Sequence, residues 1–517
     1  MEQSLLYYAF SLILLLLFCM ITYVFFDLCL SAKVLRAKLQ NQGIDGPKPG
    51  LILGNITEMQ KIKSIKHASD PSVFSLKEPP SLDCSSVLFP HFIQWSKQYG
   101  KTFTFALGKV QILYIADPGL VREINISKTL DLGKPAYLQK DRGPLLGKGL
   151  ITTNREVWSH QRKTIAHNLF VDKVKDMLSI VLVSGSKLIK SLENVVGDSG
   201  KIAEIKVDDY ARDFTCHVFS TIMFGENYPT NTGLFSKCRA LILASGSPTI
   251  LNGRPFYRFL PTKQNKQQWK LEKEVYSIIM EMTKKSTMGG EGEGMIHTLV
   301  DGANHGELGP STPQQFIVDN CKDLYLAAFE VTGIASIWGL MLLAAHPDWQ
   351  ARARAEVLEL CGREMPDAEK LSKMKVLKMI IQEVLRLYPG VAFVSREALA
   401  DVQIGKLCVP KGVNIWIWLL ALHRDTQLWG PDADKFNPKR FANGISAACK
   451  SPQAYVPFGV GPRICPGMSL AMLEMKVMFA VMLANFSFSL SPDYRHVPNF
   501  GLLLEPKYGV QLLVRKL

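Results

Sequence analysis

The chain of 517 residues is 47% hydrophobic and 21% charged, which is enough apolar sequence for one large core. Its formal net charge of +14 suits an anionic membrane surface or an acidic protein partner. Lysine and arginine do not form long runs with interleaved aromatic residues, so nucleic acid is the least favoured partner. The ten cysteines contain no CxxC pair and no zinc-ligand spacing, which indicates a reduced compartment.

The first residues form a long apolar run, which extends from Leu5 to Leu30. Asp27 is the single Asp, Glu, Lys or Arg in it, and a helix of this length exceeds the roughly 30 Å hydrocarbon core of a membrane. No lysine or arginine precedes the run, whereas several follow it directly. This pattern favours a retained signal-anchor over a cleaved signal peptide, with the rest of the chain in the cytosol.

A basic, Pro/Gly-rich stretch follows the apolar run. Residues 43–50 read GIDGPKPG, and two prolines among glycines predict a stiff turn that orients the next segment. We therefore expect three parts: an anchor at 1–32, a joint at 33–50 and a large folded domain at 51–517.

The fold class is expected to be mainly α with a smaller β part. Alternating apolar stretches between residues 51 and 130 predict a small sheet, and the last 32 residues read as strands. Most of residues 155–345 have a helical pattern, interrupted by a Gly-rich surface loop around 287–310. A helix beginning near Thr312 and ending near Ala345 is apolar on most faces, so we expect it to cross the core.

One cysteine lies in an unusual setting, the stretch PFGVGPRICPG from Pro457 to Gly467. A thiolate that binds a metal needs nearby positive charge, which Arg463 offers, and a helix N-terminus, which the helix formers after Gly467 predict. Phe458 can pack beside the sulfur of Cys465 and exclude water. The glycines leave room for a large flat cofactor. The alternative is a Gly-rich turn with a buried structural cysteine.

The stretch resembles the haem-binding signature of the cytochrome P-450 superfamily, F-x-x-G-x-R-x-C-x-G. The matching residues are Phe458, Gly461, Arg463, Cys465 and Gly467. The resemblance implies the cytochrome P-450 fold, haem b (iron protoporphyrin IX) as the cofactor, and Cys465 as the ligand of its iron.

Further motifs agree with this resemblance in their order along the chain. Glu383 and Arg386, with Arg440, are similar to the family's Glu-Arg-Arg triad, which would hold the shape of the cysteine loop. Three residues are similar to family positions that meet the haem propionates, and these are Trp158, Arg162 and Arg396. Taken alone, the first two would indicate only an amphipathic helix with a buried tryptophan.

The central helix departs from the family pattern in its stretch LAAFEVTG, residues 326–333. Ala327 and Ala328 keep the space that the family uses for dioxygen, and Glu330 keeps the acid. Val331 stands where a proton-relaying threonine is usual. Thr332 follows it, and one residue rotates a side chain by about 100° around an α-helix.

Two interpretations of this departure are open. In the favoured one, protons pass through water, Glu330 with Thr332, or a substrate group, and the protein is a monooxygenase. In the other, it is an oxygen-independent haem-thiolate isomerase or dehydratase. Glu330 could instead be an acid that is ion-paired to a neighbouring helix. A haem-binding protein without enzymatic activity is a further alternative.

Three scaffold segments carry a finer resemblance: QGIDGPKPGLILGN (42–55), VDNCKDLYLAAFEVT (318–332) and LMLLAAHPDWQARARAEVLEL (340–360). They resemble the plant group that oxidises isoprenoid hormones, most closely its gibberellin-modifying subgroup. This implies C-13 hydroxylation of a carboxylated tetracyclic diterpenoid, with epoxidation of its exocyclic alkene or another plant hormone or terpenoid as alternatives. Pocket segments are expected at 134–149, 327–331, 390–394 and 500–506. A mostly apolar cavity with one cation would suit such an acid. The loop cations, Lys134, Lys140, Arg142 and Lys148, could equally be solvated or face a redox partner.

The resemblance also implies partners and a location. Electrons would come from a separate NADPH-cytochrome reductase, because no G-x-G-x-x-G follows a strand and no length remains for a flavin domain. The expected location is the endoplasmic reticulum membrane, crossed once, with the catalytic domain cytosolic. The small-molecule partners would be dioxygen and a hydrophobic substrate.

Overall fold

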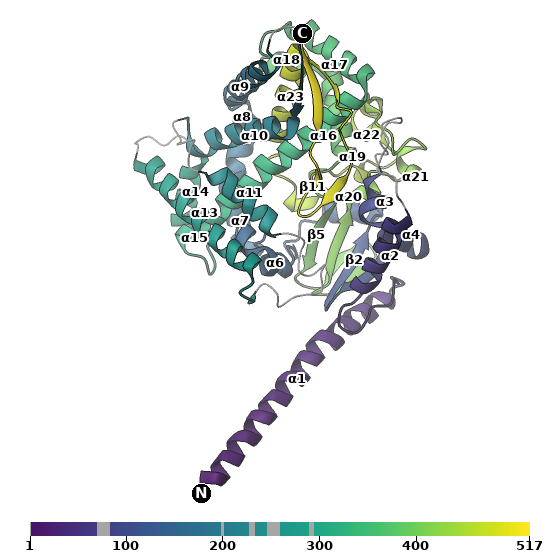
Figure 1. Ribbon diagram of the computed structural model, residues 1–517. Coiled ribbons are helices and arrows are strands. Elements are labelled where there is room, and N and C mark those ends of the chain that lie inside the picture. The colour runs from purple at the N-terminus through teal and green to yellow at the C-terminus, as the bar shows by residue number, and fades with distance from the viewer. Residues whose placement is uncertain (1, 70–82, 198–200, 227–232, 246–258, 289–293) are drawn as a thin grey trace.

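The computed structural model describes residues 2–69, 83–197, 201–226, 233–245, 259–288 and 294–517, and it shows a large helical domain with a β-rich region at one side (Figure 1). Part of the Gly-rich loop expected around 287–310 lies outside these ranges. The main helices of the domain are α4 (Pro90–Tyr99), α5 (Pro118–Ile126), α7 (Arg155–Ala166), α9 (Leu178–Val196), α10 (Val207–Phe224), α11 (Leu234–Ser245), α13 (Lys263–Met288), α14 (Met295–Asn304) and α17 (Pro347–Cys361).

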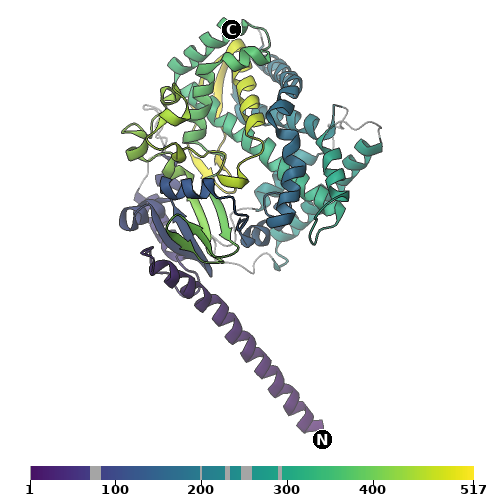
Figure 2. The same ribbon diagram turned by 180° about the vertical axis from the view of Figure 1, so that it is seen from behind.

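The N-terminal helix α1 (Glu2–Gln40) projects from the domain in both views (Figures 1 and 2). Side chains from Ser11 to Met20 are exposed, whereas Leu39 near its end is buried. The guanidinium of Arg36 donates a hydrogen bond of 2.7 Å to the carbonyl of Gly46 in the joint. The basic residues assigned to the joint therefore continue the same helix.

The β-rich region is a five-stranded sheet of strand order β1-β2-β8-β5-β3. Its strands are β1 (Thr102–Leu107), β2 (Val110–Ile115), β3 (Leu132–Gly133), β5 (Phe393–Ala398) and β8 (Asn414–Trp418). A second sheet pairs β12 (Gln511–Lys516) with β9 (Phe486–Leu490) and β4 (Ile202–Lys206). The strands expected before residue 130 and at the C-terminus are confirmed. Arg396 lies on β5, opposite Ile415 of β8.

The central helix consists of α15 (Pro313–Leu324), a π-helical turn η3 (Tyr325–Val331) and α16 (Thr332–Ala345). The hydroxyl of Thr312 caps it by accepting from the Gln315 N–H at 3.2 Å. This confirms the helix expected from Thr312 to Ala345, except for the π turn. By length and composition this helix and α23 (Met468–Asn485) could span a membrane, but most of each apolar stretch is buried in the domain.

The helix α19 (Lys375–Leu387) carries the expected triad. Arg386 donates bonds of 2.7 and 2.8 Å to the Glu383 carboxylate, and both side chains are fully buried. Arg440 lies 3.5 Å from the same carboxylate. Arg386 also donates to the carbonyls of His423 and Ala433. The triad thereby fixes the irregular segment that leads into the cysteine loop.

Candidate active site

The cysteine loop is a tight turn between this irregular segment and α23. Gly459 and Gly461 have φ of 82° and 68°, which favour glycine. A Cβ on Gly461 would also lie 2.9 Å from the Ile124 carbonyl. The Cys465 N–H closes the loop with a 2.9 Å bond to the Phe458 carbonyl. Gly467 differs, because its φ of −89° is ordinary.

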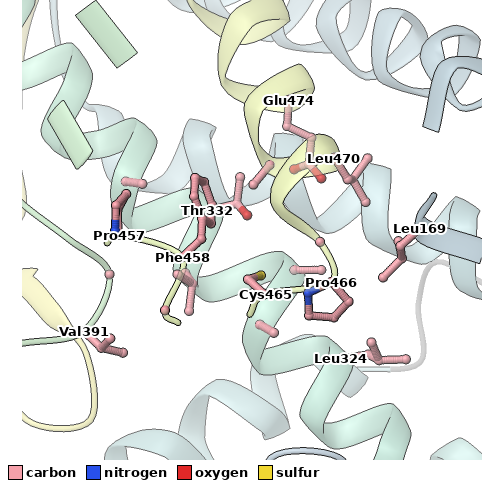
Figure 3. Close-up of a pocket in the computed structure, with 18 of the residues that line it drawn as sticks. Leu169, Leu324, Thr332, Val391, Pro457, Phe458, Cys465, Pro466, Leu470 and Glu474 are labelled. Atoms are coloured by element: carbon pink, nitrogen blue, oxygen red, sulfur yellow. The ribbon is translucent and has the colours of Figure 1, made fainter. Parts of the chain in front are cut away.

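Cys465 faces a cavity between the start of α23 and the central helix (Figure 3). The central helix contributes mainly small and apolar residues to its wall, and these are Leu324, Ala327, Ala328, Val331, Thr332 and Ala335. Gly390, Val391 and Val394 also line it, as expected for segment 390–394. Of segment 134–149 only Lys134 is among the lining residues that the structure describes, and segment 500–506 contributes none.

The Cys465 thiol experiences opposing influences. Burial raises its pKa, while the backbone N–H of Gly467 and the positive charge of Arg162 lower it. Pro466 has no backbone N–H to donate to the Cys465 sulfur, so the N–H of Gly467 is the nearby backbone donor to it. A bound cationic metal would add the positive charge that a buried thiolate needs.

Three cations line the cavity beside Cys465, and they are Lys134, Arg396 and Arg463. Burial lowers the pKa of Arg396 to about 10. Burial and the neighbouring arginines lower the pKa of Arg463 to about 9. Burial, Arg396 and Arg463 also hold the pKa of Lys134 well below its usual value. Because cations that repel each other in a buried space favour an anion, this side of the cavity suits the acidic groups of a ligand.

The arginines are held in place by the protein. Arg463 donates to the Thr153 carbonyl at 2.9 Å and to the Asn154 side-chain oxygen at 2.8 Å. Its guanidinium stacks 4.3 Å above the Trp158 ring. Its Nη1 is buried without a hydrogen-bond partner in the described structure. This nitrogen is therefore available to an acceptor on a ligand.

Trp158 and Arg162, on α7, are not among the described lining residues. Arg162 instead donates a 2.7 Å bond to the Ile464 carbonyl, directly before Cys465. Both residues thus act on the cysteine loop, Trp158 through Arg463. Lys134, which is half-buried, is one of the cavity cations, and nothing in its spacing along the sequence marks it as a cavity residue.

Glu330 is not among the described residues that line the cavity. Its carboxylate is 1% exposed and accepts bonds of 2.8 and 2.9 Å from Arg239 of α11. Arg212 of α10 lies 3.4 Å away. This is the ion-paired alternative named above, so Glu330 does not reach the cavity directly.

Thr332 and Val331 both line the cavity, although a regular α-helix would rotate them by about 100° relative to each other. Both residues have ordinary α-helical φ and ψ, and the π turn that ends at Val331 shifts the register of the residues after it, which sets the residues that face the cavity. Val331 also packs against the loop after α19, where a Cβ on Gly390 would lie 2.5 Å from its Cγ1. Thr332 therefore borders the same cavity as Val331, and its part in proton handling stays a prediction.

Among the described lining residues, the Cys465 thiol has cations beside it, and the Glu474 carboxyl group is a second possible metal donor. Within the described residues, no group of three or more His, Cys, Asp or Glu side chains could hold a metal ion together. An apolar cavity with cations on one side fits a flat macrocycle that carries acidic groups.

A comparison with known protein families identifies the family to which the chain belongs. The family described as Cytochrome P450 matches residues 81–514. This chain belongs to the cytochrome P450 family. Cytochrome P450 714C2 of Oryza sativa subsp. japonica is 43% identical over 499 residues, which cover 96% of either chain. Cytochrome P450 714A2 of Arabidopsis thaliana is 39% identical over 493 residues, with 93% of either chain covered.

Membership of the cytochrome P450 family identifies the protein as a haem-thiolate enzyme of the monooxygenase class. The thiol of Cys465, the small residues opposite it and the cations beside it fit this cofactor. Glu474 of α23 also lines the cavity, where burial raises its pKa well above the usual range.

Replacing Lys134 by Gln tests whether the cationic side of the cavity binds the acidic groups of the haem. If Lys134 pairs with an acidic group of the haem, we expect haem affinity to fall by roughly 10- to 100-fold, the strength of a charge-assisted hydrogen bond. The measurement is haem transfer from the purified protein to an apoprotein acceptor. The exposed Lys140→Gln variant is the control and should stay within about twofold of wild type. Equal haem loss in both variants would remove Lys134 from the cofactor site.

Proposed function

We propose that this cytochrome P450 is a membrane-anchored monooxygenase that hydroxylates a hydrophobic isoprenoid, a gibberellin-type diterpenoid acid at C-13. The observation that supports the oxidative chemistry is that Cys465 and the small residues of the central helix face each other across one cavity. Haem bound there supplies the oxidising chemistry, and the protein supplies binding and orientation.

Each cavity residue has a proposed part. Cys465 holds the iron, while Phe458 covers the sulfur and Gly461 and Gly467 leave room beside it. Arg396, Arg463 and Lys134 hold the propionates. Trp158 and Arg162 position the cysteine loop, and Ala327 and Ala328 leave space for dioxygen.

The proposed domain division, with an anchor at 1–32, a joint at 33–50 and a catalytic domain at 51–517, is supported by the exposed apolar side chains of α1.

Proton handling is assigned to Thr332 rather than to Glu330. Thr332 is 4% exposed and lines the cavity, so its hydroxyl can hold a proton donor close to the reacting face. Glu330, bonded to Arg239 and Arg212, is a positioning residue that fixes the π turn. Its effect on protons would then be indirect.

The substrate assignment has two supports. The apolar lining with a cationic edge suits a greasy acid. The resemblance of the scaffold segments points to the gibberellin-modifying subgroup, while the names of the relatives give only the 714 series. Epoxidation of the exocyclic alkene and oxidation of another terpenoid are the alternatives within this class.

Electrons are proposed to come from an NADPH-cytochrome reductase at the cytosolic face of the endoplasmic reticulum. The supports are the net charge of +14, which suits an acidic docking partner, and the projecting helix α1, which suits a single membrane span.

A second candidate is an oxygen-independent haem-thiolate isomerase or dehydratase. The observation that favours it is Val331 at the position where a threonine is usual, together with Glu330 held in ion pairs. This candidate requires neither NADPH nor dioxygen.

Turnover under heavy-isotope dioxygen tests the proposed function. Microsomes that contain the protein, a plant reductase and NADPH are supplied with a panel of gibberellin precursors. We expect a product with one heavy oxygen from the gas, identified by mass. A product formed without NADPH, or without the label, would establish the second candidate instead. No product across the panel, from protein with an intact haem-thiolate spectrum, would contradict the gibberellin assignment.

Replacing Thr332 by Ala tests the proton assignment. We expect product per NADPH to fall at least about tenfold and hydrogen peroxide to rise, because a positioned proton donor commonly contributes more than this. Thr332→Ser, which keeps the hydroxyl, should retain coupling. The measurement is the ratio of product, peroxide and consumed NADPH. Unchanged coupling in Thr332→Ala would show that protons reach the site by another route.

A further inference from the structure

Asn154 lies directly before the helix α7, where an asparagine normally caps a helix by accepting from a backbone N–H of the first turn. Its side chain makes no such bond. The next residue, Arg155, has φ of 52°, and in the part of the chain that the structure describes only glycines share a positive φ with it. A helix start that lacks its cap and carries backbone strain indicates that the asparagine is engaged elsewhere.

The side-chain amide of Asn154 is bonded to the backbone of Lys134. Its oxygen accepts a 2.6 Å bond from the Lys134 N–H, and its nitrogen donates a 3.0 Å bond to the Lys134 carbonyl. One side chain thus pairs with both backbone polar groups of this lysine. Because Lys134 lines the cavity beside Cys465, these two bonds fix the point on the cavity wall from which the lysine side chain extends.

The same amide oxygen holds a second cation of the cavity. Nη2 of Arg463 donates a 2.8 Å bond to it and a 2.9 Å bond to the carbonyl of Thr153. Nη1 of Arg463 is buried and has no hydrogen-bond partner among the described residues. Since the guanidinium is planar and rigid, two acceptors on Nη2 determine where Nη1 points.

The amide of Asn154 fits these partners in one orientation. Its oxygen uses both lone pairs, one on the Lys134 N–H and one on Arg463. Exchanging the oxygen and nitrogen would set the NH2 group against two donors and the oxygen against the Lys134 carbonyl. Gly133 makes room for this orientation, because a Cβ there would lie 2.5 Å from the Asn154 oxygen.

The two cations that Asn154 holds repel each other. Burial, and then the charges of Arg396 and Arg463, keep the pKa of Lys134 well below its usual value. Like charges in a buried space separate unless other contacts hold them. The amide of Asn154 is neutral, so it holds both cations without cancelling their charge. That charge stays available to an anionic group of a ligand.

We infer that Asn154 is the positioning residue of this anion site, where it holds Lys134 and Arg463 at a fixed separation so that the acidic groups of the cofactor meet both. Asn154 is not among the described residues that line the cavity, so it acts through the two cations. The inference rests on the proposed function, in which Lys134, Arg396 and Arg463 hold the haem propionates, and it adds the residue that arranges them.

The test compares haem with its dimethyl ester, in which both propionates are neutral. Wild type and Asn154→Ala are each produced with either macrocycle, and the rate of its transfer to an apoprotein acceptor is measured. Wild type should release the ester roughly 10- to 100-fold faster than haem, the strength of charge-assisted hydrogen bonds. In Asn154→Ala this ratio should fall about tenfold, because haem is released faster while release of the ester is unchanged. Asn304→Ala, at an exposed position of α14, should behave as wild type.

A second variant, Gly133→Ala, keeps every polar group but places a methyl group against the amide oxygen, so it should lower the ratio in the same direction. An unchanged ratio in both variants, or an equally faster release of haem and ester, would overturn the inference and leave the proposed propionate contacts in place. Equal release of the two macrocycles by wild type would contradict those contacts and the inference with them. Failure of wild type to bind either macrocycle would contradict the haem site itself.

Discussion

The fully buried pair of Glu383 and Arg386 is the interaction on which the geometry at the cysteine depends. Its guanidinium reaches beyond the carboxylate to three carbonyls of the irregular segment, those of His423, Ala433 and Lys435. The His423 ring then accepts from the Val456 N–H, one residue before the cysteine loop. Removing one partner of such a pair strands a buried charge at a cost of about 3–5 kcal/mol. This is a large part of the stability of an ordinary domain, so α19 and the loop have to form together.

A second ionic cluster does the same for the opposite wall of the cavity. Glu330 joins the central helix to Arg212 of α10 and Arg239 of α11, and both arginines approach Glu505 near the C-terminus. The π turn allows the helix to face two ways within a few residues. Its acid turns outward to the arginines, while Val331 and Thr332 border the cavity. The cavity is thus held between two buried ion networks, with an apolar interior that suits oxidation of an apolar molecule.

Much of this arrangement follows from local sequence. The positive-φ glycines, the arginine and the helix start around Cys465 lie within eleven residues, so the loop and the start of α23 could be predicted from their spacing. The long apolar run with its Thr312 cap and the following His346-Pro347 marked the central helix in the same way. The Glu383, Arg386 and Arg440 triad required the order of motifs along the chain, because a Glu-x-x-Arg pair alone is common on surfaces.

The remainder depends on contacts between distant segments. The π turn arises where α10, α11 and the central helix meet, and no residue in LAAFEVTG predicts it. Lys134 and Arg142 look like ordinary loop cations in the sequence, yet folding brings the first beside Arg396 and Arg463 and buries the second, which lies on α6 (Ala136–Leu146). From the sequence, Glu330 is a candidate proton carrier. In the structure its carboxylate accepts a hydrogen bond from Arg239, 91 residues earlier in the chain. The periodicity of apolar residues along the sequence carries no information on contacts between residues that are far apart in the chain.

The measurement that tests the central claim most directly is the carbon monoxide difference spectrum of the reduced, haem-loaded protein, recorded for wild type and Cys465→Ala. The account predicts a thiolate-type carbonyl spectrum for wild type and its loss in the variant, with the fold retained by circular dichroism. A thiolate-type spectrum that persists in Cys465→Ala, or that is absent from haem-loaded wild type, would contradict the assignment of Cys465 as the ligand around which the cavity is built.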